Sequence, residues 1–132
     1  MGDTSANRGA AWYRATRKLL GLNDRQWWAE YIGVSSSVVD QWERGKQAIP
    51  AHRIEQLAEI SAQVLDLIDT TIAAIDAGER GLVLVTYRTN HDYRVAEPGS
   101  VFPAAWHEAW TARVVAERPE VELRWAEPAS PE

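Results

Sequence analysis

The sequence predicts a mainly α-helical protein that ends in a small α+β unit. Apolar residues recur at three- and four-residue spacing through residues 10–77, and glycines or capping residues interrupt the pattern at intervals typical of short helices. Short runs with strand character appear only after Gly81. We therefore expect four segments, a flexible N-terminus at 1–9, a helical domain at 10–77, an α+β unit at 78–126 and a flexible tail at 127–132.

Residues 10–33 predict two short helices. The first spans 10–20 and ends at Gly21. The second begins at Asn23, an N-cap residue with Gln26 three positions later, and stops at Gly33. The expected buried positions of the first helix are Trp12, Ala15, Leu19 and Leu20, with Arg14, Arg17 and Lys18 on its opposite side.

Two further helices follow. Ser35 or Ser36 is expected to cap the third, which ends at Arg44 and Gly45. After a loop, residues 51–77 predict a helix roughly 40 Å long, since each residue adds ~1.5 Å. Its apolar stripe consists of Ile54, Leu57, Ala58, Ser61, Val64, Leu65, Ile68, Ile72 and Ile75.

The C-terminal part predicts a β-α-β arrangement. The β-branched run 82–87 and the alternating run 121–125 are expected to be strands, and 103–117 to be a helix between them. The polar stretch 89–100 is expected to be a loop, with a short strand at 93–95 as the alternative. This unit is expected to be attached to the long helix.

Composition excludes several classes of protein. The chain has no cysteine, which removes disulfides, thiolate metal sites and cysteine nucleophiles. Its three histidines, His52, His91 and His107, are scattered, so we expect no metal, no cofactor and no enzymatic activity. The first residues lack a signal-peptide pattern, and no stretch approaches the ~18 apolar residues of a membrane helix. We expect a cytoplasmic protein without membrane contact.

The charge is distributed unevenly along the chain. Residues 1–53 hold eight Lys/Arg against five Asp/Glu, a net charge of +3. Residues 54–132 hold six Arg against fourteen Asp/Glu, a net charge of −8, so the two parts sum to −5. A basic front part can approach phosphate while an acidic back part stays away from it.

The segment 25–44 carries the pattern of a helix-turn-helix. The motif needs a small residue where its two helices cross, a residue that accepts positive φ in the turn, and apolar anchors beneath the second helix. Those requirements are met at fixed offsets by Ala29, Gly33, Val39 and Trp42.

The outward face of the second helix of this motif is polar. A recognition helix enters the major groove with its N-terminus first, so Gln41 is expected to pair with adenine and Asp40 to accept from cytosine. The residues expected to face bases are Ser36, Ser37, Asp40, Gln41 and Arg44. Those expected to contact phosphates are Arg17, Lys18, Arg25, Ser35 and Lys46.

On these residues the sequence resembles the XRE class, the lambda-repressor and Cro-like helix-turn-helix regulators, over about residues 10–76. A narrower resemblance links it to the YdiL/DUF1870-type regulators, which include autorepressors associated with anti-CRISPR operons. The segments that carry it are 17–20 (RKLL), 29–35 (AEYIGVS), 42–45 (WERG), 48–50 (AIP) and 76–80 (DAGER). The resemblance implies a lambda-repressor-like helical bundle, a C-terminal dimer contact and binding to inverted repeats of double-stranded DNA.

The function expected from sequence is a homodimeric repressor, located at the nucleoid when bound to DNA. Two alternatives stay open: an antitoxin whose C-terminal part binds a toxin, and a small enzyme with a pocket near Arg88, His91 and Arg94. The tryptophans of the C-terminal unit are the expected dimer contact, because aromatic residues supply much of the burial at interfaces. They are Trp106, Trp110 and Trp125.

Overall fold

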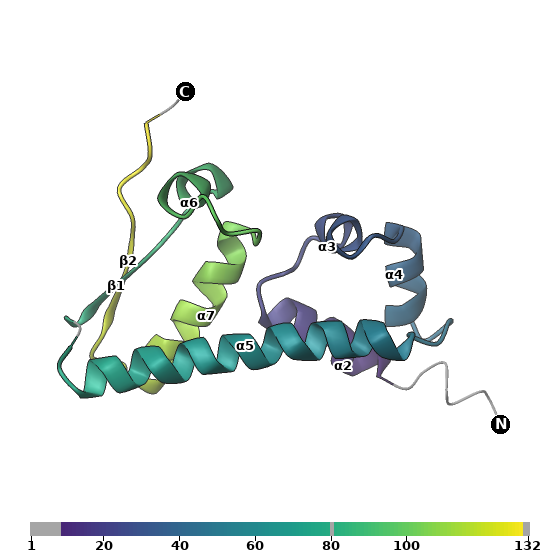
Figure 1. Ribbon diagram of the computed structural model, residues 1–132, viewed down its shortest axis with the longest axis horizontal. Coiled ribbons are helices and arrows are strands. Elements are labelled where there is room, and N and C mark those ends of the chain that lie inside the picture. Colours follow the sequence, from purple (N-terminus) through teal and green to yellow (C-terminus); the bar gives the residue numbers. More distant parts are fainter. Residues whose placement is uncertain (1–8, 80, 131–132) are drawn as a thin grey trace. The chain divides into compact units, whose positions relative to one another are not determined.

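The computed structural model describes residues 9–79 and 81–130, and Figure 1 shows its elements. This part of the chain is mainly helical and holds one two-stranded parallel sheet. Contacts divide the chain into two compact units, with the boundary after Gln63. That boundary lies inside the long helix α5 (Ala51–Asp76) rather than after it. Apart from Gly9, the N-terminus expected to be flexible lies outside the described residues.

The first unit consists of three short helices and the beginning of α5. The short helices are α2 (Ala10–Leu19), α3 (Arg25–Ile32) and α4 (Ser36–Glu43), close to their expected positions. Tyr13 lies at the centre of the core: Trp28 donates a hydrogen bond to its hydroxyl at 3.0 Å. Burial raises the pKa of Tyr13 to about 12. The other large buried side chains of this unit are Leu20, Leu22, Ile32, Val39, Trp42, Ile49, Leu57 and Ile60.

The predicted buried stripe of the first helix is correct for Leu20 and wrong for its other three positions. Trp12 and Ala15 are exposed, and Leu19 is 52% exposed, whereas Tyr13 and Arg17 are buried. Successive helix positions lie about 100° apart, so the buried face is rotated by roughly one residue. Tyr13 and Arg17 can occupy it because the Tyr13 hydroxyl accepts from Trp28 and the Arg17 guanidinium pairs with Glu43.

The N-cap of α3 is Asp24 and not Asn23. The Asp24 carboxylate accepts the backbone N–H of Trp27 at 3.2 Å, and Asn23 lies one position outside the helix. The carbonyl of Asn23 instead accepts a hydrogen bond from Arg17. Capping is decided by backbone geometry at the first turn, which a local sequence pattern places only to within a residue or two.

This cap yields a prediction. Replacing Asp24 with alanine is expected to lower the free energy of unfolding by about 1 kcal/mol, because the N–H of Trp27 loses its acceptor. The matched control is Asn23→Ala, which removes a neighbouring side chain that caps nothing and should leave stability nearly unchanged. Urea unfolding of both variants is the measurement. Equal losses for the two variants would contradict the assignment.

Helix α5 buries different residues in the two units. Leu57 and Ile60 belong to the core of the first unit, and Val64, Ile68 and Ile75 to that of the second. The predicted stripe is therefore correct in part. The exceptions are Ala58 and Leu65, which are exposed, and Ile60 and Thr71, which are buried although they do not belong to the predicted stripe.

The second unit adds a small sheet and two helices to the end of α5. Strands β1 (Val83–Thr86) and β2 (Glu122–Trp125) pair in parallel, with Leu84 opposite Leu123. Helix α7 (Ala104–Glu117) lies between them in sequence, as predicted. The buried residues include Leu84, Thr86, Tyr93, Ala104, Trp110, Thr111, Val114 and Val121.

The prediction for 89–100 is wrong, because this stretch contains helix α6 (Asn90–Ala96) rather than a loop or strand. Thr89 caps the helix by accepting the N–H of Asp92. The tail expected to be flexible is held in part, since the N–H of Ala129 donates to the Asp92 carboxylate at 2.9 Å. Residues 131–132 of that tail lie outside the described residues.

His107 on α7 is half-buried in the second unit and gives a second prediction. Its Nδ1 lies 2.8 Å from the Thr86 hydroxyl, and the rings of Tyr87, Tyr93 and Trp110 surround it at 5.0–5.3 Å. Burial lowers the pKa of His107 from 6.5 to about 4. Because the unfolded chain binds a proton that the folded chain does not, stability is present above pH 6.5 and is lost progressively as the pH falls toward 4.

The variant His107→Gln is expected to flatten this dependence, because glutamine can still bond to Thr86 but does not titrate. Urea midpoints of the two proteins, compared between neutral and mildly acidic pH, are the measurement. Parallel pH profiles for wild type and variant would show that another group causes the loss.

Candidate nucleic-acid interface

Helices α3 and α4 are joined by a tight turn centred on Gly33. Gly33 has φ of 83°, and the N–H groups of Gly33 and Val34 both donate to the carbonyl of Ala29 at 2.9 Å. An added Cβ at Gly33 would meet no atom within 4 Å, so the backbone conformation, and not space, is what requires glycine. Ser35 then caps α4 by accepting the N–H of Val38.

The underside of α4 is anchored in the first unit. Val39 and Trp42 are buried, and the Trp42 ring packs edge-on against Tyr13 at 5.8 Å. Ala29 is buried as well. The four residues predicted to form the core of the motif therefore have the burial and turn conformation that the motif requires.

The opposite face of α4 is polar and accessible. Ser37 and Arg44 are exposed, while Ser36, Asp40 and Gln41 are half-buried. The five side chains predicted to face bases thus all keep some contact with solvent.

An ion-pair network lies across this face. Asp40 accepts from Arg25 at 3.3 Å and from Arg44 at 3.5 Å. Arg25 also donates to the hydroxyl of Ser36, so α3 and α4 are linked at the surface. These two arginines neutralise the charge of the Asp40 carboxylate. The arrangement makes Asp40 a residue that positions both arginines.

The loop after α4 brings a further cation close to this network. The carbonyl of Gln41 accepts the backbone N–H groups of Lys46 at 2.9 Å and of Gln47 at 3.3 Å. Lys46 is exposed. Arg25, Arg44 and Lys46 thus carry three positive charges against the one negative charge of Asp40.

The predicted role of Arg17 is corrected by its position. Arg17 is 2% exposed, and its guanidinium makes two bonds of 2.8 Å to the carboxylate of Glu43. It also donates to the carbonyls of Leu22 and Asn23. A guanidinium committed in this way cannot reach a phosphate, so Arg17 ties α2 to α4 instead. Lys18, one residue later, is exposed.

Glu43 and Arg53 are structural residues of this site that the sequence pattern missed. Arg53 donates to the carbonyl of Ile32 at 2.8 Å, at the end of α3. Glu43 lies 26 residues from Arg17, and Arg53 lies 21 residues from Ile32. No local signal could have paired them, although Glu43 belongs to the WERG segment noted above.

The predicted dimer tryptophans differ in their accessibility. Trp110 is buried within the single chain, so it is a core residue and not a surface contact. Trp106 is half-buried and stacks on Phe102 at 4.6 Å. Only Trp125 of the three is exposed, at 42%, with the Arg88 guanidinium 5.4 Å from its ring centre.

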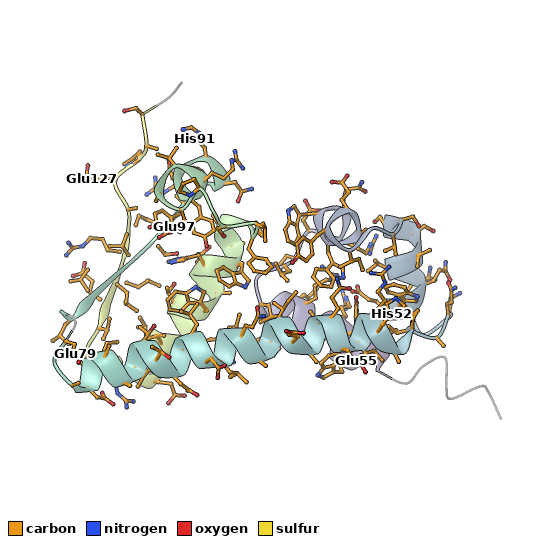
Figure 2. The ribbon with its side chains drawn as sticks, in the orientation of Figure 1. His52, Glu55, Glu79, His91, Glu97 and Glu127 are labelled. Atoms are coloured by element: carbon orange, nitrogen blue, oxygen red, sulfur yellow. The ribbon has the colours of Figure 1, made fainter. Side chains whose placement is uncertain are left out.

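The histidines lie on three different helices, and Figure 2 labels His52 on α5 and His91 on α6. Among the described residues no three His, Asp or Glu side chains are grouped in a way that could hold a metal ion. A pocket of about 290 Å³ lies beside Arg88, but its lining includes neither His91 nor Arg94.

None of the helices in the described ranges combines the length and the apolar composition that crossing a membrane requires. No known protein family and no curated protein matches this sequence.

Proposed function

We propose that this protein is a sequence-specific DNA-binding transcription regulator, a homodimeric repressor in which α3 and α4 form a helix-turn-helix and α4 is the recognition helix. The observation that carries the proposal is the two-sided character of α4. Its underside is fixed by Val39 and Trp42, and its outer side presents polar groups together with the cations Arg44 and, from α3, Arg25.

Chemistry on the outer side suits base edges. Gln41 offers a donor and an acceptor on one amide, which matches the two groups of adenine in the major groove. Arg44 can donate two parallel bonds to guanine, and the Asp40 carboxylate holds it in place beforehand. Ser36 and Ser37 lie at the N-terminal end of α4, which enters the groove first.

Phosphate contacts come from residues around this helix. Arg25 lies at the start of α3, Lys46 follows α4, and Lys18 lies on α2. Such contacts set the register of a protein on the duplex but do not read sequence. A dimer would place two recognition helices on half-sites about one helical turn, ~10 bp, or a multiple of it apart.

The burial within the second unit favours the repressor over the antitoxin alternative. A segment that folds only on a toxin would have few buried residues of its own, whereas Tyr93, Trp110 and Val114 are buried within this unit. We therefore assign that unit to self-association.

The test is a gel shift of the purified protein on the DNA upstream of its own gene, with a salt series and a non-specific competitor. The expected result is a discrete band that survives competitor and weakens steeply with salt, because phosphate contacts release counterions. A smear that competitor removes, or no shift, would overturn the proposal.

A further inference from the structure

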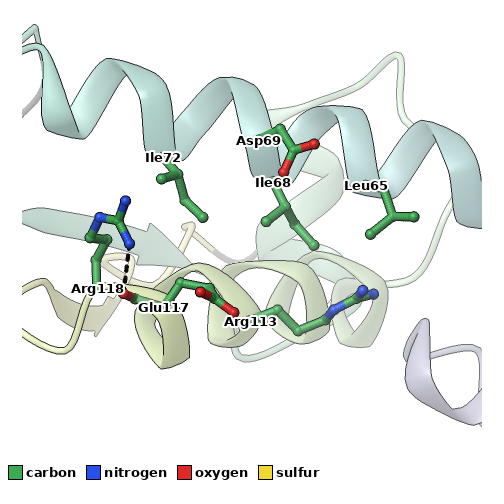
Figure 3. Close-up of a pocket in the computed structure, with 7 residues that line it drawn as sticks. All are labelled: Leu65, Ile68, Asp69, Ile72, Arg113, Glu117 and Arg118. Carbon is green, nitrogen blue, oxygen red and sulfur yellow. Dashed lines mark hydrogen bonds between the residues drawn. The ribbon is translucent and has the colours of Figure 1, made fainter.

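A groove of about 350 Å³ lies in the second unit, between α5 and α7. Figure 3 shows Leu65 and Arg113 at one end of it and Ile72 and Arg118 at the other. Leu65 is 46% exposed, which leaves a large apolar side chain facing water on the rim. This groove combines apolar surface with charge, a composition typical of contacts between proteins.

Three charged groups of the groove form no ion pair within the described residues. Arg113 is one of them, and its Nη1 is buried there without a hydrogen bond. An unpaired guanidinium is costly to cover, so a surface that packs on Arg113 must bring an acceptor for the N–H groups that are still accessible. The carboxylates of Asp69 and Glu117 line the same groove and have no ion pair in this part of the chain either.

The balance of charge decides which occupant fits. Arg118 is already engaged by Asp76 in two bonds of 2.7 and 2.8 Å. One free cation against two free carboxylates would repel a phosphate, a nucleic acid or a small carboxylate ligand. A surface that carries both a cation and anions can instead form ion pairs with a second copy of itself across a twofold axis, as in isologous interfaces.

We propose that this groove is the surface through which two copies of the chain associate. Arg113 and Glu117 lie four residues apart on α7 and therefore on one face of that helix. We place the two α7 helices antiparallel, with the twofold axis crossing them at the height of Val115. Arg113 of each copy then lies opposite Glu117 of the other. Both ion pairs then form at once, and Leu65 of each copy is covered.

This inference rests on the proposed function only for the reason why the protein should dimerise: a protein that binds an inverted repeat needs twofold symmetry. The groove takes the place of the three tryptophans as the proposed dimer contact. Its test is the state of association without DNA, so failure of DNA binding and failure of this interface give different results.

Sedimentation equilibrium of two reversed-charge variants tests the groove. Arg113→Glu places two carboxylates opposite each other across the interface, and Glu117→Arg places two guanidinium groups there. Each variant alone is expected to raise the dimer dissociation constant by about tenfold or more, because like charges across an interface repel. The matched control is Arg94→Glu, the same charge change at an exposed position of α6, which should leave the dimer unchanged.

Mixing the two variants separates a contact between copies from damage to the fold. In the mixed dimer, two carboxylates of one chain face two guanidinium groups of the other, so association is expected to return to nearly the wild-type constant. Circular dichroism checks that each variant is folded. A monomeric wild type, variants that dimerise like the wild type, or folded variants whose mixture stays monomeric would each overturn the proposal.

Discussion

Replacing Gln41 and Arg44 together with alanine is expected to abolish sequence-specific DNA binding and to leave the fold intact. Each side chain can make a bidentate bond to a base, worth about 1–3 kcal/mol of discrimination, so the pair should account for about a hundredfold or more in affinity for the operator. Neither side chain is buried in the core, so the free energy of unfolding should change little.

The measurement is the gel shift described above, read as the ratio of operator affinity to affinity for random DNA. The matched control is Gln63→Ala with Arg94→Ala, which removes the same two residue types from exposed positions outside α4. If the variant without Gln41 and Arg44 still prefers the operator over random DNA, this face of α4 does not recognise the base sequence. An equal loss in the control would show that the loss follows from total charge and not from position.

Replacing Glu43 with alanine is expected to destabilise the first unit by about 3–5 kcal/mol, because it leaves the Arg17 guanidinium buried without its counter-charge. Both side chains of this pair are only 3% exposed. The pair also joins α2 to the C-terminal end of α4, so the position of α4 depends on it. DNA affinity should therefore fall with stability, although Glu43 is not expected to touch DNA.

Urea unfolding at fixed pH measures this loss. A good control is Arg124→Ala, which breaks an arginine–glutamate pair of similar length, 3.0 Å to Glu122, in which both side chains are more than half exposed. Such a pair in water contributes little, so the control should show no clear change. The double variant Arg17→Leu with Glu43→Leu should lose less than the sum of the two single replacements. Additive losses would mean that the two residues do not act as a pair.

The elements that were predicted correctly are those whose signals are local. Glycine at the end of α3 and serine at the start of α4 act within a single turn of chain, and the structure has both where the sequence indicates. The apolar spacing of α5 repeats over many turns, so its existence could be predicted although its exact buried face could not. The burial of Val39 and Trp42 followed from their offsets from Gly33.

The predictions that were wrong involve contacts between distant segments or signals too short to recognise. Arg17 was placed on the polar side of its helix because nothing nearby in sequence shows its partner, Glu43. Helix α6 has seven residues and buries only Tyr93, so no apolar periodicity develops. The residue type of Trp110 indicates burial, but it does not indicate whether the side chain is buried in the core of its own chain or against a second chain. The structure buries it in the core.

The parallel pairing of β1 with β2 determines the order in which the two units can form during synthesis. All residues of the first unit have been synthesised once translation has passed Gln63. The sheet joins residues 83–86 to residues 122–125, so its second strand emerges only when translation is nearly finished. In a nascent chain the contacts around α3 and α4 can thus form early, whereas the paired strands of the second unit can form only late. Ribosome-bound chains stalled before residue 122 would be expected to hold a folded first unit beside an incomplete second one.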